Sequence, residues 1–340
     1  MHACKAATQA YLIHGALALA SCRSKIGAMG PPEPAMLNRR RALRTLAAAG
    51  AYAVLRPSTV LAQPRAIMTR PVPSTGEALP VVGLGSWITF NVGDDPVARD
   101  ACTDVMRNFV ETGGRMIDSS PMYGSSQDVI GYGLRKAALT GRIFSADKVW
   151  ISSGAQGREQ IERSSRKWQV GRFDLVQVHN LLNWQEHLPT LFAMKATGQV
   201  RYVGITTSEG RRHRDIEQLM RSQAIDFVQV TYNPVDREVE ERILPLARDR
   251  GIAVIVNRPF REGALLRALA RQPLPPWAAD IDCTSWAQFV LKFIVSHPAV
   301  TCAIPATTSV AHVRENMNAA YGRLPDAALR QRMIAAVERA

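Results

Sequence analysis

Several polar residues stand at the ends of short apolar runs in this chain, where side chains able to do chemistry are often placed. Asp118 follows Met116-Ile117, and His179 ends the run Leu175-Val176-Gln177-Val178. The other polar residues at such ends are Thr206, Thr207, Gln229, Asn257 and Arg258. Any single one of them could be a structural polar residue, but together they indicate one site.

The alternation of side chains along a strand tests whether these residues converge. If Val176 and Val178 face outward, then Gln177 and His179 face the opposite side. The same reasoning turns Gln229 inward between two valines. We therefore expect the polar residues, among them Asp118 and His179, to meet at one mouth.

The elements that must position these residues alternate from about Gly76 to the end of the chain. Amphipathic helical stretches separate eight β-branched runs, which predicts a parallel sheet. Eight strand–helix units close a (β/α)8 TIM barrel in a single domain, with reactive groups at the carboxyl ends of the strands. An open α/β sheet is the alternative. The predicted strands are 81–86, 115–118, 149–152, 175–179, 202–206, 227–230, 253–257 and 301–304.

Four separated motifs resemble the aldo/keto reductase family. They are Ile117-Asp-Ser-Ser-Pro-Met-Tyr-Gly124, Phe173-Asp-Leu-Val-Gln-Val-His-Asn180, Gly198-Gln-Val-Arg-Tyr-Val-Gly-Ile205 and Ile304-Pro-Ala-Thr307. The resemblance runs from about Leu79 to Asn316. It implies NAD(P)H-dependent reduction of small aldehydes or ketones. Tyr123 would donate the proton, His179 would polarise the carbonyl, and Asp118 would support a lysine that lowers the pKa of the tyrosine.

The position of that lysine departs from the family pattern. If the third strand is Val149–Ser152, the lysine should follow it, and Gly154 stands there instead. Lys148 would lie at the wrong end of the strand, so Asp118 would lack a cation. On this reading turnover is impaired and enzyme activity is uncertain. The alternative function is a non-catalytic barrel that binds a nicotinamide cofactor or a partner.

The resemblance also implies a set of cofactor and substrate residues. Tyr232 would stack on the nicotinamide, Gln229 would hold its carboxamide, and Trp87 would line the substrate pocket. The full implied cofactor set is Ser86, Thr206, Thr207, Gln229, Tyr232, Arg258, Pro259, Thr307 and Asn316. Ala306 and His312 replace the basic residues that usually engage the 2′-phosphate of NADPH, so both NADP(H) and NAD(H) remain candidates.

The residues ahead of the barrel predict a removable export signal. Arg39-Arg40 opens a basic segment, a short apolar run follows, and Val60-Leu61-Ala62 fits a cleavage site. We interpret residues 36–62 as resembling a twin-arginine signal, with the export machinery as a partner and a periplasmic location. A non-functional signal would leave the protein cytoplasmic. Residues 1–35 are a possible start-site artefact or disordered, 63–78 a linker, 79–323 the barrel and 324–340 a C-terminal helix.

The composition excludes several classes. The net charge is +13, but residues 1–62 carry +7 of it, and the remaining +6 forms no recognition motif for nucleic acid. No apolar run is long enough to predict a membrane span. The five cysteines lack metal-ligand spacing, so we expect no metal site.

Overall fold

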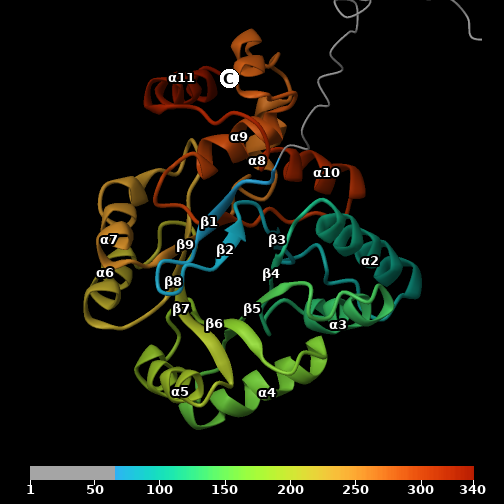
Figure 1. Ribbon diagram of the computed structural model, residues 1–340, viewed down its shortest axis with the longest axis vertical. Helices are drawn as coiled ribbons and strands as arrows, with labels where there is room; N and C mark the ends of the chain where they lie inside the picture. The colour runs from blue at the N-terminus through green and yellow to red at the C-terminus, as the bar shows by residue number, and fades with distance from the viewer. Residues whose placement is uncertain (1–65) are drawn as a thin grey trace, which may run out of the picture. The chain divides into compact units, whose positions relative to one another are not determined.

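The eight parallel strands of the computed structural model, which describes residues 66–340, follow one another around a barrel in chain order (Figure 1). They are β3 (Leu84–Gly85), β4 (Met116–Asp118), β5 (Phe144–Val149), β6 (Phe173–His179), β7 (Val200–Thr206), β8 (Phe227–Thr231), β9 (Ala253–Asn257) and β10 (Cys302–Ala303). Parallel bridges from Val82 to Ala303 and from Gly85 to Ala306 join the last strand to the first. The predicted TIM barrel is confirmed.

Helices separate the strands and surround them (Figure 1). They are α2 (Pro96–Glu111), α3 (Ser126–Lys136), α4 (Gly157–Trp168), α5 (Trp184–Ala196), α6 (His213–Ser222), α7 (Ile243–Arg250), α8 (Ala264–Leu269), α9 (Trp286–Val295), α10 (Val310–Asn318) and α11 (Ala327–Glu338). Short 3₁₀ segments are η1 (Gly154–Gln156), η2 (Glu238–Glu240) and η3 (Pro276–Ile281). The connection between β9 and β10 carries two helices, α8 and α9.

Strand alternation divides the apolar core into two layers. Inward residues fill the lower lumen, where the Phe144, Tyr202 and Phe227 rings pack with centroids 5.4–6.0 Å apart. Outward residues such as Val176 and Val228 meet the apolar faces of the helices. Since large buried side chains fill the lumen from below, polar chemistry is confined to its upper end.

A β-hairpin closes the lower end of the lumen. β1 (Thr69–Pro71) pairs antiparallel with β2 (Ala78–Pro80), and both lie across the strands in the view of Figure 1. Val72 and Leu79 are fully buried against the lumen core. The stretch predicted to be a linker as far as residue 78 therefore contains folded structure from Thr69 onward.

The third barrel strand lies earlier in the sequence than predicted. It spans Phe144–Val149, whereas the prediction placed it at 149–152. Phe144 and Ala146 point into the lumen, so Lys148, two residues further along, points inward at the carboxyl end of the strand. The prediction favoured the more apolar run Val149-Trp150-Ile151, because a charged pair inside a buried strand is uncommon.

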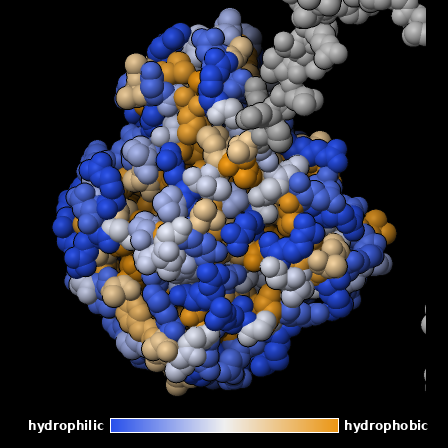
Figure 2. Space-filling view, in the orientation of Figure 1, coloured by the Kyte–Doolittle hydropathy of each residue, from blue (hydrophilic) through white to orange (hydrophobic). Residues whose placement is uncertain are grey.

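Hydrophilic residues cover most of the face seen in Figure 2. Within residues 66–340, no helix has the length and apolar character needed to cross a membrane. The predicted signal in residues 36–62 and the proposed start-site artefact in residues 1–35 lie outside the described residues.

Candidate active site

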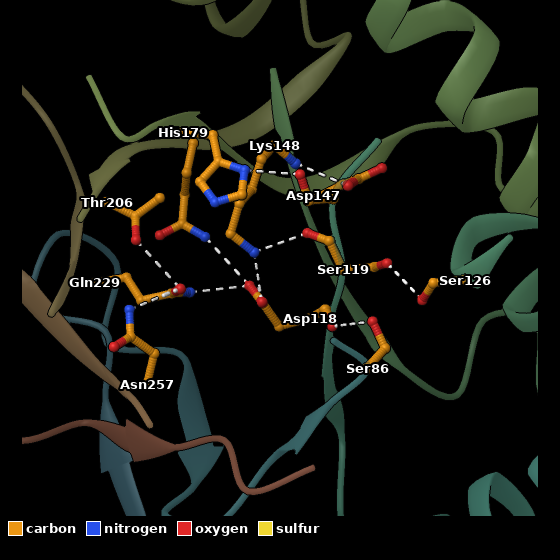
Figure 3. A network of polar contacts seen from close by, with 12 residues as sticks. Ser86, Asp118, Ser119, Ser126, Asp147, Lys148, His179, Thr206, Gln229 and Asn257 are labelled. Carbon is orange, nitrogen blue, oxygen red and sulfur yellow. Dashed lines mark hydrogen bonds and ion pairs between the residues drawn. The ribbon is translucent and has the colours of Figure 1, made fainter. Parts of the chain in front are cut away.

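A buried ion pair lies at the upper end of the barrel lumen. The Lys148 ammonium donates to Asp118 Oδ1 at 2.5 Å and to the Ser119 carbonyl oxygen at 2.7 Å (Figure 3). Both charged side chains are 2% exposed or less. Burial alone would lower the pKa of Lys148, but the neighbouring Asp118, Tyr123 and Asp147 raise it above its ordinary value. Lys148 is therefore a fixed cation at neutral pH.

The prediction that Asp118 lacks a cation is wrong. It followed from the misplaced third strand, which put Gly154 where the lysine was expected. Gly154 instead begins η1, where an added Cβ would lie 2.4 Å from Glu186 Cβ. A side chain is therefore excluded at that position by packing, and the cation comes from within β5.

The second oxygen of Asp118 is held by two amides. Gln229 Nε2 donates to Oδ2 at 3.0 Å, and Gln177 Nε2 donates at 3.3 Å. The backbone carbonyl of Asp118 also accepts from Ser86 Oγ at 2.8 Å. A buried carboxylate is costly unless its oxygens are paired, and this one is paired on both.

Tyr123 lies directly over the lysine. The Lys148 ammonium is 5.2 Å from the centroid of the phenol ring, and the His179 ring meets the same phenol edge-on at 5.7 Å. Burial raises the pKa of Tyr123 above its usual value, and the charge of Lys148 opposes that rise. The hydroxyl is therefore protonated at neutral pH and stands beside a cation that stabilises its conjugate base.

His179 is the last residue of β6 and remains neutral. Burial, with smaller contributions from Lys148 and Arg211, lowers its pKa to about 2. Its Nδ1 lies 2.8 Å from Ser120 Oγ, two residues beyond the end of β4. The ring therefore offers one donor and one acceptor, as neutral imidazole does.

A further group of polar residues lies at the ends of β7, β8 and β9. Gln229 Oε1 accepts from Thr206 Oγ1 at 3.2 Å and from Asn257 Nδ2 at 3.4 Å. Asn257 also donates to the Thr207 carbonyl at 2.9 Å and accepts from Thr231. These bonds fix the Gln229 amide with its nitrogen toward Asp118.

Asp118, Tyr123, His179, Gln229 and Asn257 line one cavity of about 610 Å³. All but one of the sequence-predicted site residues border it: Ser86, Trp87, Asp118, Tyr123, His179, Thr206, Thr207, Gln229, Arg258, Pro259, Thr307 and Asn316. The Trp87 ring lies 6.5 Å from that of Tyr123, and Arg258 lies 5.9 Å from the Trp87 ring and bonds to Glu209 at 2.9 Å. The cavity therefore runs from the reactive centre to the loop after β10.

Tyr232 is the predicted residue that does not reach the cavity. Thr231, the residue before it, faces inward, so Tyr232 points outward and is fully buried. Its hydroxyl bonds to Glu240 and accepts from Arg330, and its ring packs on Phe293. The predicted nicotinamide contact is wrong because the alternation of β8 turns this side chain toward the helices.

The sequence analysis missed three residues of the site: Lys148, Ser120 and Gln177. Lys148 continues the alternation of the inward-facing residues Phe144 and Ala146, and this pattern could have placed it in the lumen. Gln177 was already placed on the inward face with His179, which is the face that reaches Asp118.

Among residues 66–340, no cluster of His, Cys, Asp or Glu is suited to hold a metal.

Comparison with known proteins identifies relatives of this chain. The family model described as "Aldo/keto reductase family" matches residues 81–333. The methylglyoxal reductase YeaE of Escherichia coli is 27% identical over 246 residues, covering 70% of this chain and 84% of the relative. The NADH-specific methylglyoxal reductase of the same organism is 24% identical and covers 79% of this chain and 99% of the relative.

Solved structures share the fold. An aldo-keto reductase from Klebsiella pneumoniae in complex with NADPH has a TM-score of 0.64 and 24% identity, covering 78% of this chain and 92% of that chain. An aldo-keto reductase from Bacillus halodurans has a TM-score of 0.65 and 22% identity, covering 80% of this chain and 96% of that chain.

Proposed function

Because the chain belongs to the aldo/keto reductase family, we propose that it reduces small aldehydes or ketones with NADPH or NADH. The observation that carries the proposal is the contact of Lys148 with both Asp118 and Tyr123 at the floor of the cavity. The inference of impaired turnover has no remaining basis, since its premise was the absence of this lysine.

The residues around the cavity fit a nicotinamide dinucleotide. Gln229 holds its oxygen toward Thr206 and Asn257, and its amide nitrogen carries a second proton besides the one given to Asp118. The rest of the lining combines apolar side chains with the cations of Arg211 and Arg258 and the carboxylates of Glu209, Glu262 and Glu315. When bound, the cofactor supplies a hydride to the carbonyl carbon.

The protein residues then have to supply one proton and polarise one oxygen. The Tyr123 hydroxyl donates the proton, and the negative charge that develops on it is stabilised by Lys148. The neutral His179 ring donates a hydrogen bond to the same carbonyl oxygen. Asp118 holds Lys148 in place through the 2.5 Å contact, while Gln177 and Gln229 hold Asp118.

The test uses the purified full-length chain. We expect NADPH or NADH to quench protein fluorescence on titration, because Trp87 borders the cavity. We also expect consumption of the bound cofactor in the presence of a 2-oxoaldehyde such as methylglyoxal, or of an activated aromatic aldehyde. No binding of either cofactor would exclude the proposal, and binding without turnover of any carbonyl compound would leave the alternative of a binding protein.

We propose separately that residues 36–62 direct export of the protein to the periplasm by the twin-arginine route. The Arg39-Arg40 pair and the small residues of Val60-Leu61-Ala62 support this proposal. The test is cell fractionation of the full-length chain beside the double variant Arg39→Lys, Arg40→Lys. Equal amounts of both proteins in the periplasm would exclude it.

A further inference from the structure

The hydrogen bond between Ser120 and His179 decides which ring nitrogen carries the proton. A neutral imidazole has one protonated and one unprotonated nitrogen, and only the protonated one can donate to a carbonyl oxygen. His179 lines the cavity, and within residues 66–340 the hydrogen bond of its ring is made by Nδ1 and leaves Nε2 available. The other nitrogen, Nδ1, lies 2.8 Å from Ser120 Oγ.

The surroundings of Ser120 fix the direction of this bond. The Met122 backbone N–H donates to Ser120 Oγ at 3.3 Å, which occupies one of its two acceptor positions. The hydroxyl has a single proton, and Ser120 is fully buried. Among the described residues, His179 Nδ1 is the one acceptor placed to receive that proton. The reverse direction would leave the hydroxyl proton buried without a partner, which is costly.

We propose that Ser120 is a positioning residue that donates to His179 Nδ1 and thereby holds the proton on Nε2, facing the carbonyl oxygen of the substrate. Only the expected effect of Ser120 on the reaction rate rests on the reductase function proposed above. The tautomer itself is a property of the protein without substrate, and the test below reads it directly.

The Ser120–His179 hydrogen bond joins two separate parts of the barrel mouth. Ser120 follows β4 and His179 ends β6, so the bond crosses the mouth above the end of β5 and joins parts of the chain 59 residues apart. The adjacent Ser119 has a separate partner, since its Oγ lies 3.0 Å from Ser126 Oγ. The two buried serines are therefore matched in burial and chemistry, but only Ser120 contacts the histidine.

The experiment is ¹⁵N NMR of the full-length chain labelled at histidine nitrogens, with His179→Gln assigning the His179 signals. We expect Nδ1 to be unprotonated and Nε2 protonated in the wild type. Ser120→Ala should move both signals toward exchange-averaged values, whereas Ser119→Ala should leave both unchanged. A proton on Nδ1 in the wild type, or unchanged His179 signals in Ser120→Ala, would overturn the proposal whatever the enzyme activity.

The catalytic consequence is measured with the same variants. Losing one orienting hydrogen bond should lower kcat/KM about tenfold in Ser120→Ala, while the Kd of the cofactor stays the same. Ser120→Thr keeps the hydroxyl and should restore both the NMR signals and most of the rate. If the wild type has no reductase activity, the NMR comparison alone decides the role of Ser120.

Discussion

Replacing Lys148 by methionine removes the cation beside Tyr123 and keeps a side chain of similar length. Over the 5.2 Å from the ammonium to the ring centroid, a full phenolate charge gains about 3 kcal/mol at an effective dielectric constant of about 20. That energy corresponds to a factor of roughly 200 in rate. Since the proton is only partly transferred in the transition state, we expect kcat to fall between about 10-fold and 200-fold.

The same change should destabilise the fold. Lys148→Met leaves the buried Asp118 carboxylate with only its two glutamine donors, and losing one partner of a buried pair costs about 3–5 kcal/mol. Adding Asp118→Asn removes the unpaired charge and should recover about 2 kcal/mol without restoring activity. Urea unfolding measures the stability, and cofactor oxidation in the presence of an aldehyde measures kcat.

The control is Lys167→Met, which makes the same chemical change at a lysine that is 43% exposed and pairs with Asp128 on the surface. It should keep the wild-type rate and lose less than about 1 kcal/mol of stability. A folded Lys148→Met protein with wild-type kcat would refute the assignment of Lys148.

Three further outcomes test other parts of the site. Tyr232→Phe should leave the cofactor Kd unchanged, because the hydroxyl bonds to Glu240 and Arg330 away from the cavity. Losing these hydrogen bonds should lower the free energy of unfolding by about 1 kcal/mol. Weaker cofactor binding in a titration would contradict this placement of Tyr232. Gln229→Leu should weaken cofactor binding at least about tenfold in the same titration, through loss of a fixed amide; an unchanged Kd would remove Gln229 from the cofactor site. The pKa of His179 is about 2 in the folded protein against 6.5 ordinarily, so the unfolded chain binds the extra proton below pH 6.5. The free energy of unfolding should therefore fall with pH below that value, by about 1.4 kcal/mol per unit from this group, and His179→Gln should have a correspondingly shallower slope in urea unfolding at pH 5 to 7.

Sequence patterns predicted the barrel because both of its periodicities are visible locally. Runs such as Leu175–Val178 alternate inward and outward residues, and the helical stretches repeat apolar residues at helical spacing. These patterns also placed Asp118, His179 and Gln229 on the lumen side, and the structure brings all three to one cavity.

The remaining errors arose where tertiary contacts override local pattern. Asp147 and Lys148 are charged residues inside a fully buried strand, and they are tolerated because Gln127 and Asp118 pair with them. No local signal announces such partners, which lie 20 and 30 residues away. The prediction for Tyr232 was wrong for a related reason. It followed the family resemblance, although the strand alternation that turns Gln229 inward turns Tyr232 outward.

The hairpin of β1 and β2 closes one end of the barrel, so only the opposite end has to stay open to substrate. Glu77 in its turn accepts from Arg201 and Tyr202, so the hairpin is tied to the strands at the end opposite the reactive centre. The described residues therefore begin at the end of the barrel opposite the mouth. A surface linkage through this hairpin should leave substrate access free, which makes it the natural point for immobilising the barrel.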